Sequence, residues 1–262
     1  MSTGSTGGVH GPTADPPGTA RPPGRGPEVD AVVIGAMDEE VRPYSQAATD
    51  AGPVRQRGRA RGQLVQIGGA SILLVRSGIG LVNAAAALVA ALSECRPRAV
   101  LSTGSAGGLG TSVRVGDVVA GDTYTYTGAD ATAFDYVRGQ VPGMPVAYDA
   151  DPDLLAAART LSPPAGTLRV GQMVSGDSFV TAVNVTHVRE SFPDALSTDM
   201  ESTALAQVAF SYGLPFLSVR GISDLCGPVE EYGEQVESFH LGLGEAAERS
   251  ARVILTLLDG GR

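Results

Sequence analysis

Short apolar runs alternate with alanine-rich stretches of helical period along the chain from Val29 onward. The apolar runs are bounded mainly by glycine, which is typical of strands buried on both faces of a sheet. They predict strands at Ala31–Gly35, Leu64–Ile67, Ser71–Ser77, Ala99–Ser102, Asp117–Thr127, Leu168–Ser175 and Phe216–Ile222. The stretches between and after them predict helices at Asp38–Ala48, Val82–Cys95, Pro152–Thr160, Thr181–Glu190, Asp199–Tyr212 and Phe239–Asp259.

This order of strands and helices predicts an α/β fold built on a largely parallel, covered sheet. No internal repeat and no second linker interrupt it, so residues 29–262 are expected to form one domain. Residues 1–28 are dominated by Gly, Pro, Ser and Thr and carry almost no large apolar side chain. Such a segment cannot bury enough surface to offset its ordering entropy, so we expect a disordered tail.

The charge balance narrows the classes of function. The chain of 262 residues has 19 basic and 28 acidic residues, a net charge of −9, and all of its basic residues are Arg. An acidic surface is repelled by nucleic acids and by anionic membranes, so neither partner is expected. No apolar run is long enough to span a bilayer. The absence of Lys excludes Schiff-base chemistry and a Walker lysine.

The residues that bind metals are scattered. Cys95 and Cys226 are far apart, and His10, His187 and His240 are isolated from them and from one another. We therefore expect two buried, reduced thiols and neither a metal site nor a cofactor. With few cysteines and no apolar core of a secretory signal, the expected location is the cytoplasm.

Two glycine-rich segments follow predicted strands. Gly78 and Gly80 open a helix, but Asn83 replaces the third glycine of a dinucleotide fingerprint, which favours a turn that packs a helix against the sheet. The segment Ser102–Gly108 is composed of small residues. It is either a tight strand-to-loop turn or a backbone surface whose N–H groups face an anion or a sugar.

Three carboxylates stand just past predicted strands: Glu40, Glu201 and Asp224. Ligands of open α/β sheets bind at the carboxyl ends of the strands, so these side chains are candidates for one shared crevice. Each also has a structural interpretation. Glu40 would complement a helix dipole, Glu201 would close a capping box with Thr198, and Asp224 would cap the segment after its strand.

Eight ordered motifs together resemble one family, the 5′-methylthioadenosine/S-adenosylhomocysteine nucleosidases of the purine nucleoside phosphorylase superfamily. The motifs are Ile34–Val41, Ser77–Gly80, Thr103–Gly108, Val115–Val119, Asp130–Phe134, Val174–Asp177, Asp199–Glu201 and Arg220–Asp224. The resemblance extends from about residue 30 to the C-terminus. It implies a single-domain, three-layer α/β/α fold with a central mixed, mostly parallel twisted sheet.

The resemblance also implies an activity, the hydrolysis of the N-glycosidic bond of 5′-methylthioadenosine and S-adenosylhomocysteine, and also of 5′-deoxyadenosine. Asp224 matches the acid that protonates N7 of adenine, and Glu40 matches the base that activates water. Glu201 matches the carboxylate that binds the ribose hydroxyls. A protonated adenine is a better leaving group than the anion, so the acid needs a raised pKa.

Further positions follow from the same resemblance. Met200 matches a residue beneath the ribose, Ser105 one near the base and the acid, and Phe179 an aromatic stacked on adenine. Val180 would contact the base through its backbone, and Ile79 and Met37 would form walls of the site. A plain role in the core remains open for each of these. A homodimer whose partner closes the 5′ pocket is implied, as is a role in methionine salvage.

The sequence departs from the family pattern at three places. Asp199 stands where Glu is usual, as a shorter side chain in the same role at a helix start, and Thr125–Ala129 lacks the histidine that is often found there. The segment after Asp224, which helps to form the 5′ pocket, is also altered. A nucleosidase for a specialised adenosine derivative, such as a futalosine-type substrate, therefore remains an alternative. So do a purine nucleoside or methylthioadenosine phosphorylase, although Ser102 stands where phosphorylases carry an Arg, and a catalytically silent nucleoside sensor.

Overall fold

The computed structural model describes residues 26–163, 166–227 and 232–260. Most of the predicted disordered tail lies outside these ranges, and the first strand begins at Glu28. The strands are β1 (Glu28–Gly35), β2 (Asp50–Ala51), β3 (Arg55–Arg57), β4 (Ala60–Ile67), β5 (Ala70–Arg76), β6 (Arg96–Gly108), β7 (Val118–Tyr126), β8 (Tyr148–Asp149), β9 (Leu168–Ser175), β10 (Ser197–Asp199) and β11 (Phe216–Leu225). The helices are α1 (Asp38–Ala47), α2 (Leu81–Glu94), α3 (Pro152–Arg159), α4 (Val185–Ser191), α5 (Ser202–Ser211) and α6 (Tyr232–Gly260), with a 3₁₀ turn at Thr132–Phe134.

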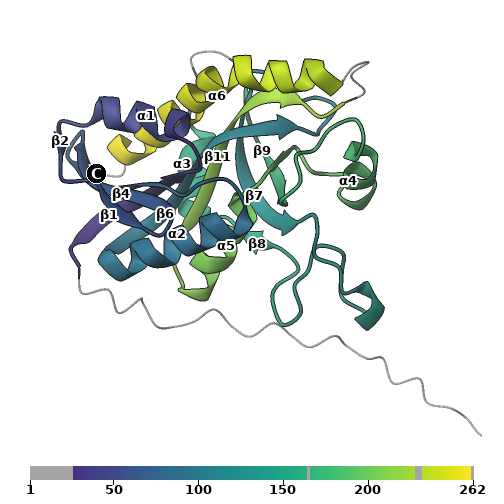
Figure 1. Ribbon diagram of the computed structural model, residues 1–262, viewed down its shortest axis with the longest axis horizontal. Coiled ribbons are helices and arrows are strands. Elements are labelled where there is room, and N and C mark those ends of the chain that lie inside the picture. Colours follow the sequence, from purple (N-terminus) through teal and green to yellow (C-terminus); the bar gives the residue numbers. More distant parts are fainter. Residues whose placement is uncertain (1–25, 164–165, 228–231, 261–262) are drawn as a thin grey trace, which may run out of the picture.

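The strands form one mixed sheet in the order β10-β9-β7-β11-β6-β1-β5-β4-β2. Its central strands β5, β1, β6 and β11 are parallel, so their carboxyl ends lie along one edge. Helices cover both faces: α1 and α6 lie on one side, and α2 and α5 on the other (Figure 1). Val32, Leu101 and Leu217 in the central strands are buried, and burying a side chain of this size contributes about 1.5–3 kcal/mol. This architecture confirms the predicted fold class.

The short strand β10 gives the sheet a feature that the sequence did not predict. It pairs in parallel with β9 and also antiparallel with the end of β6, where Thr198 lies opposite Gly107. Strands β6, β11, β7, β9 and β10 therefore form a closed ring of hydrogen-bonded neighbours. The ring brings β10 against the carboxyl ends of β6 and β11.

The glycine-rich segment Ser102–Gly108 is strand, which excludes the first of its two predicted alternatives, a tight strand-to-loop turn. It continues β6 and pairs with β11, so that Ser102 lies opposite Ser218 and Gly108 opposite Leu225. Its small residues leave room for side chains from the neighbouring strand. A Cβ on Gly107 would approach the Cys226 sulfur to 2.5 Å.

Several other boundaries also differ from the prediction. Helix α6 begins at Tyr232 instead of Phe239, because its first turns are too polar to show a helical apolar period. Helix α5 begins at Ser202, because Asp199 belongs to β10, and α4 begins at Val185, after a turn in which Thr181 accepts from Asn184. Strands β2, β3, β8 and β10 have at most three residues, too few to reveal a period.

Candidate active site

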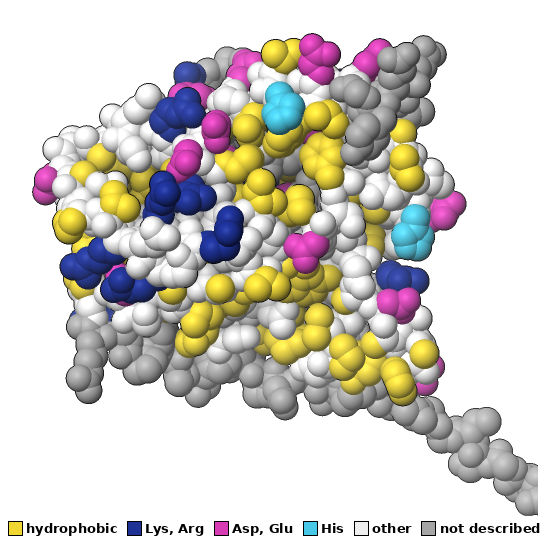
Figure 2. Space-filling model, viewed as in Figure 1, with side chains coloured by type: hydrophobic (Ala, Val, Ile, Leu, Met, Phe, Trp, Pro, Cys, Tyr) yellow, Lys and Arg dark blue, Asp and Glu magenta, His cyan; other side chains and the backbone are white. Residues whose placement is uncertain are grey.

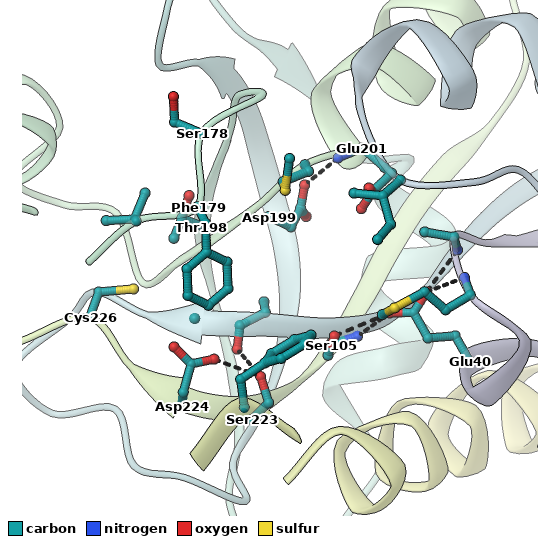
Figure 3. Close-up of a pocket in the computed structure, with 18 residues that line it drawn as sticks. Glu40, Ser105, Ser178, Phe179, Thr198, Asp199, Glu201, Ser223, Asp224 and Cys226 are labelled. Atoms are coloured by element: carbon teal, nitrogen blue, oxygen red, sulfur yellow. Dashed lines mark hydrogen bonds between the residues drawn. The ribbon is translucent and has the colours of Figure 1, made fainter. Parts of the chain in front are cut away.

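A cavity of about 170 Å³ opens at the carboxyl ends of β1, β6 and β11 and beside β10. It brings together every residue that the sequence analysis proposed for the site: Met37, Glu40, Ile79, Ser105, Phe179, Val180, Met200, Glu201 and Asp224. Figure 3 shows Asp224 at one end, below the Phe179 ring, and Glu40 at the other end, with Ser105 between them. The three candidate carboxylates are all buried.

Glu40 lies in the first turn of α1, and four hydrogen bonds fix its carboxylate. Oε2 accepts from the backbone nitrogens of Ala36 (2.7 Å) and Met37 (3.1 Å). Oε1 accepts from the backbone nitrogen and the hydroxyl of Ser105, at 2.9 and 3.1 Å. The structural interpretation predicted only that Glu40 complements the helix dipole. Its bond to Met37 also caps the helix, and its burial and its bonds to β6 go beyond a surface interaction with a dipole.

The predicted capping box at Glu201 does not form. Asp199 caps the helix instead: its Oδ1 accepts from the backbone nitrogens of Glu201 and Ser202, both at 2.9 Å. The Glu201 side chain crosses to the start of α2, where Oε1 accepts from the nitrogen of Gly80 at 2.9 Å. Gly80 has a φ of +105°, so the glycine at this turn lets the backbone point its N–H at Glu201.

Arg220 is fully buried in β11, behind the cavity, and it neutralises part of this acidic cluster. Its Nε lies 3.4 Å from Asp199 Oδ2, and its Nη1 lies 3.4 Å from Glu201 Oε2. Burial raises the pKa of Glu201 to about 7, an effect that Arg220 opposes and that Asp199 and Glu40 reinforce. The protonation state of Glu201 is therefore set by its burial and by these three neighbouring charged groups.

Asp224 lies inside β11, because this strand continues to Leu225 and does not stop at Ile222 as predicted. Among the described residues its side chain caps no helix, and part of the segment that it was expected to cap, residues 228–231, lies outside them. Oδ1 accepts from the Ser223 hydroxyl and Oδ2 from Gln235 Nε2, each at 2.8 Å. Burial raises the pKa of Asp224 above its ordinary value, although both hydrogen bonds act in the opposite direction. A carboxyl that keeps its proton at higher pH is suited to act as a general acid.

The two phenyl rings of Phe179 and Phe239 form an apolar wall near Asp224. Their centroids are 5.5 Å apart and the rings meet edge to face at 76°. Cys226 lines the same end of the cavity, and both cysteines are free and buried, as predicted. Ile79 is 50% exposed and lines the cavity together with Met37.

Comparisons with known proteins agree with this geometry. A model of the family described as the phosphorylase superfamily matches residues 30–259. The 5′-methylthioadenosine/S-adenosylhomocysteine nucleosidase of Staphylococcus carnosus (strain TM300) is 37% identical over 228 residues, which are 86% of this chain and 97% of the relative. The enzyme of that name from Marinomonas sp. (strain MWYL1) is 40% identical over 233 residues, 87% of this chain and 97% of the relative.

The chain belongs to the 5′-methylthioadenosine/S-adenosylhomocysteine nucleosidase family. The crystal structure of the Neisseria meningitidis nucleosidase with methylthio-immucillin-A has a TM-score of 0.79 and 33% identity, and the match covers 87% of this chain and 98% of that one. The Streptococcus pneumoniae nucleosidase with 8-aminoadenine has a TM-score of 0.81 and 30% identity, over 88% and 99%. The family predicted from the ordered motifs is thereby confirmed.

Two polar residues of this nucleosidase-family site were not singled out from the sequence. Arg220 has a signal in retrospect, since one charged residue inside an apolar strand needs buried partners. Gln235 has none, because it lies in the polar segment that gave no helical period. In the part of the chain that the structure describes, no three His, Cys, Asp or Glu side chains are grouped to hold a metal, and no helix is long and apolar enough to cross a membrane.

Proposed function

We propose that this protein hydrolyses the N-glycosidic bond of 5′-methylthioadenosine and S-adenosylhomocysteine, and also of 5′-deoxyadenosine, releasing adenine and a 5-substituted ribose. The observation that carries the proposal is the convergence of Glu40, Glu201 and Asp224 on one cavity with three different sets of partners. Three carboxylates in three environments can serve as base, sugar ligand and acid. The two free thiols suit the reducing cytoplasm, which is the location we propose.

In the proposed mechanism Asp224 donates a proton to N7 of adenine. The bond between C1′ and N9 then breaks, and its electron pair stays with a neutral base. The raised pKa of Asp224 supports this role, because the acid is protonated over a wider range of pH. The neighbouring Phe179 ring is the surface on which adenine would stack, and the backbone of Val180 would contact the edge of the base.

Glu40 accepts the proton of the attacking water in this mechanism, and water adds to C1′ as the base leaves. Glu201 would bind the ribose hydroxyls, with Met200 beneath the ring. A negative charge close to the sugar also stabilises an oxocarbenium-like transition state. Arg220 supports Glu201 from behind the cavity without entering it. Ile79 and Met37 would form walls of the site.

Water is favoured over phosphate as the nucleophile. Among the described residues that line the cavity none is an Arg, and Glu40 would repel a phosphate dianion. Ser102, which stands where phosphorylases carry an Arg, accepts from Arg220 Nη2 at 3.0 Å. Arg76 pairs with Asp38 at 3.2 Å and is not among the lining residues.

A product assay on 5′-methylthioadenosine tests the proposal, first in phosphate-free buffer and then with added phosphate. We expect adenine and free methylthioribose at the same rate in both. Release of adenine only with phosphate, together with a sugar 1-phosphate, would identify a phosphorylase instead. An absence of product in both buffers, with adenine released from a futalosine-type nucleoside, would identify a specialised nucleosidase.

We also propose a homodimer. Exposed apolar side chains gather on α2 and on the segment between β7 and β8, which projects from the body of the molecule in Figure 1; they are Val82, Val89, Phe134, Val137 and Val146. Figure 2 shows hydrophobic side chains along the lower part of the same face. A patch of this kind marks an interface. Light scattering should give twice the chain mass, and Phe134→Glu should shift it toward the monomer.

A further inference from the structure

Gln235 joins α6 to both the proposed acid and the proposed base-binding segment. Its side chain is 2% exposed. Nε2 donates to the Val180 carbonyl and to Asp224 Oδ2, each at 2.8 Å. The two hydrogens of this amide group are therefore both used, and they connect two residues that line the cavity from different parts of the chain.

The orientation of the Gln235 amide follows from its partners. The carbonyl of Val180 can only accept a hydrogen bond, so the atom facing it must be the nitrogen. The amide oxygen, Oε1, is buried and has no hydrogen-bond partner within the described residues. An unpartnered buried oxygen is unfavourable, and an apolar side chain of the same length would avoid that cost. The two donated bonds are therefore the feature that favours an amide here.

Ser223 provides a different kind of partner for Asp224. Its hydroxyl lies 2.8 Å from Asp224 Oδ1 and 3.4 Å from the carbonyl of Ala106. A hydroxyl can rotate, so Ser223 can accept from a protonated Oδ1 while it donates to Ala106. The Gln235 nitrogen cannot accept, so a proton on Oδ2 has no acceptor in that direction. The two oxygens of Asp224 therefore differ: a proton on Oδ1 has a hydrogen-bond acceptor in Ser223, and a proton on Oδ2 has none in Gln235.

We propose that Gln235 is a positioning residue that keeps the acidic proton of Asp224 on Oδ1 and holds this carboxyl in a fixed relation to Phe179 and Val180. The inference rests on the proposed function, in which Asp224 is the acid. Figure 3 shows the Asp224 carboxyl beside Ser223, with Phe179 above it. When the Oδ1 proton passes to N7, the Ser223 hydroxyl rotates to donate, and both oxygens of the new carboxylate then accept a hydrogen bond.

The test is the pH profile of kcat/KM, which reports ionisations of the free enzyme, for the full chain and for Gln235→Met. Methionine keeps the length and removes the donor. Without that donor the ionised form of Asp224 loses a hydrogen bond, so the basic limb should move to higher pH. We expect kcat on the plateau to fall about tenfold, because the Asp224 carboxyl loses its fixed orientation. KM should stay within about threefold, because substrate binding does not depend on that orientation.

Gln235→Glu provides a second variant of the same size in case the first does not fold, as judged by circular dichroism. Two carboxyls this close cannot both ionise, so its basic limb should also move to higher pH. Glu237→Ala, at an exposed position on the same helix, is the matched control and should behave as the parent.

An unchanged basic limb in both folded variants would overturn the inference. A fall in KM at unchanged kcat would also overturn it, since that result would mean that the Gln235 amide only hinders the binding of adenine. Both outcomes require an active parent enzyme. A parent and a Glu237→Ala control that release no adenine would instead contradict the proposed function.

Discussion

The hydroxyl of Ser105 lies 3.1 Å from Oε1 of Glu40, the oxygen that already accepts the Ser105 backbone N–H at 2.9 Å. A carboxylate has about four lone-pair sites, and four protein donors occupy those of Glu40. Three of the donors are backbone N–H groups, which cannot turn away. The Ser105 hydroxyl can rotate, so in the proposed mechanism it is the donor that would yield its place to the attacking water.

Ser105→Ala should therefore have a small effect. It removes one hydrogen bond to Glu40 and leaves the backbone bond, so we expect kcat to stay within about tenfold of the parent. Glu40→Gln removes the proposed base and should reduce kcat by more than about a thousandfold without unfolding the protein. Steady-state kinetics and thermal melting measure both. A loss in Ser105→Ala as large as that in Glu40→Gln would mean that the hydroxyl itself takes part in catalysis.

Gly104→Ala should abolish turnover. Gly104 has a φ of +144°, and a Cβ there would meet Oε1 of Glu40 and would lie 2.8 Å from Arg220 Nη1. Gly143→Ala is the control, because Gly143 also has a positive φ (+79°) but has no atom within 4 Å of an added Cβ. The control should cost about 1–2 kcal/mol of stability from backbone strain alone and should keep its activity. Equal activity in the two variants would contradict the importance of the close packing around Glu40.

Asp224→Asn should lose activity and alter the pH dependence of stability. The pKa of Asp224 is raised in the folded protein, so the folded state binds more protons than the unfolded chain above the unfolded pKa. The free energy of unfolding of the parent therefore falls as pH rises from that value through the native pKa. The variant lacks this term.

Calorimetry at pH 5 and pH 8 measures the effect. The Tm of Asp224→Asn relative to the parent should be higher at pH 8 than at pH 5. A difference in Tm that is independent of pH would contradict the raised pKa, whereas retention of more than about a tenth of the parent turnover would contradict the role as acid.

Arg220→Met should strongly destabilise the fold. It leaves Asp199 and Glu201 buried without their counter-charge, a change that costs about 3–5 kcal/mol in buried pairs. Arg57→Met breaks an ion pair with Glu94 that is shorter, at 2.6 Å, but the Arg57 side chain is 55% exposed, so the cost should be under about 1 kcal/mol. Denaturant unfolding compares the two. Similar losses would mean that burial does not decide the strength of these pairs.

The strands of the central sheet were predictable because each carries an apolar run long enough to reveal its burial. Ser102–Gly108 was not, since small residues give no hydrophobic period and their pairing depends on β10 and β11, which are distant in sequence. The boundary at Asp199 failed for a related reason. Its side chain caps α5 while its backbone pairs with Ser175, and only the three-dimensional neighbours distinguish these roles.

The side chains of the site also divide into those that the sequence identified and those that it did not. Glu40, Glu201 and Asp224 were identifiable because they follow predicted strands and belong to ordered motifs. Arg220 gives one local signal, a charge inside an apolar strand, but its partner Ser102 lies 118 positions away in sequence. Gln235 gives no local signal, and its partners Val180 and Asp224 lie 55 and 11 positions away.

Because of the closed ring of strands, the two ends of the cavity differ in how firmly backbone pairing restrains them. Strand β10 is hydrogen-bonded along both edges, to β9 and to β6, so it leaves the sheet only when both pairings break. Full detachment of this strand should therefore be rarer than the opening of a single strand pair. Glu201 lies two residues after this strand, whereas Phe179 and Val180 lie in a connection between β9 and α4 that belongs to no strand of the described chain. If Glu201 binds the ribose as proposed, the sugar end of the cavity is the more firmly restrained end, and adjustment to a nucleoside falls to the end that holds the base.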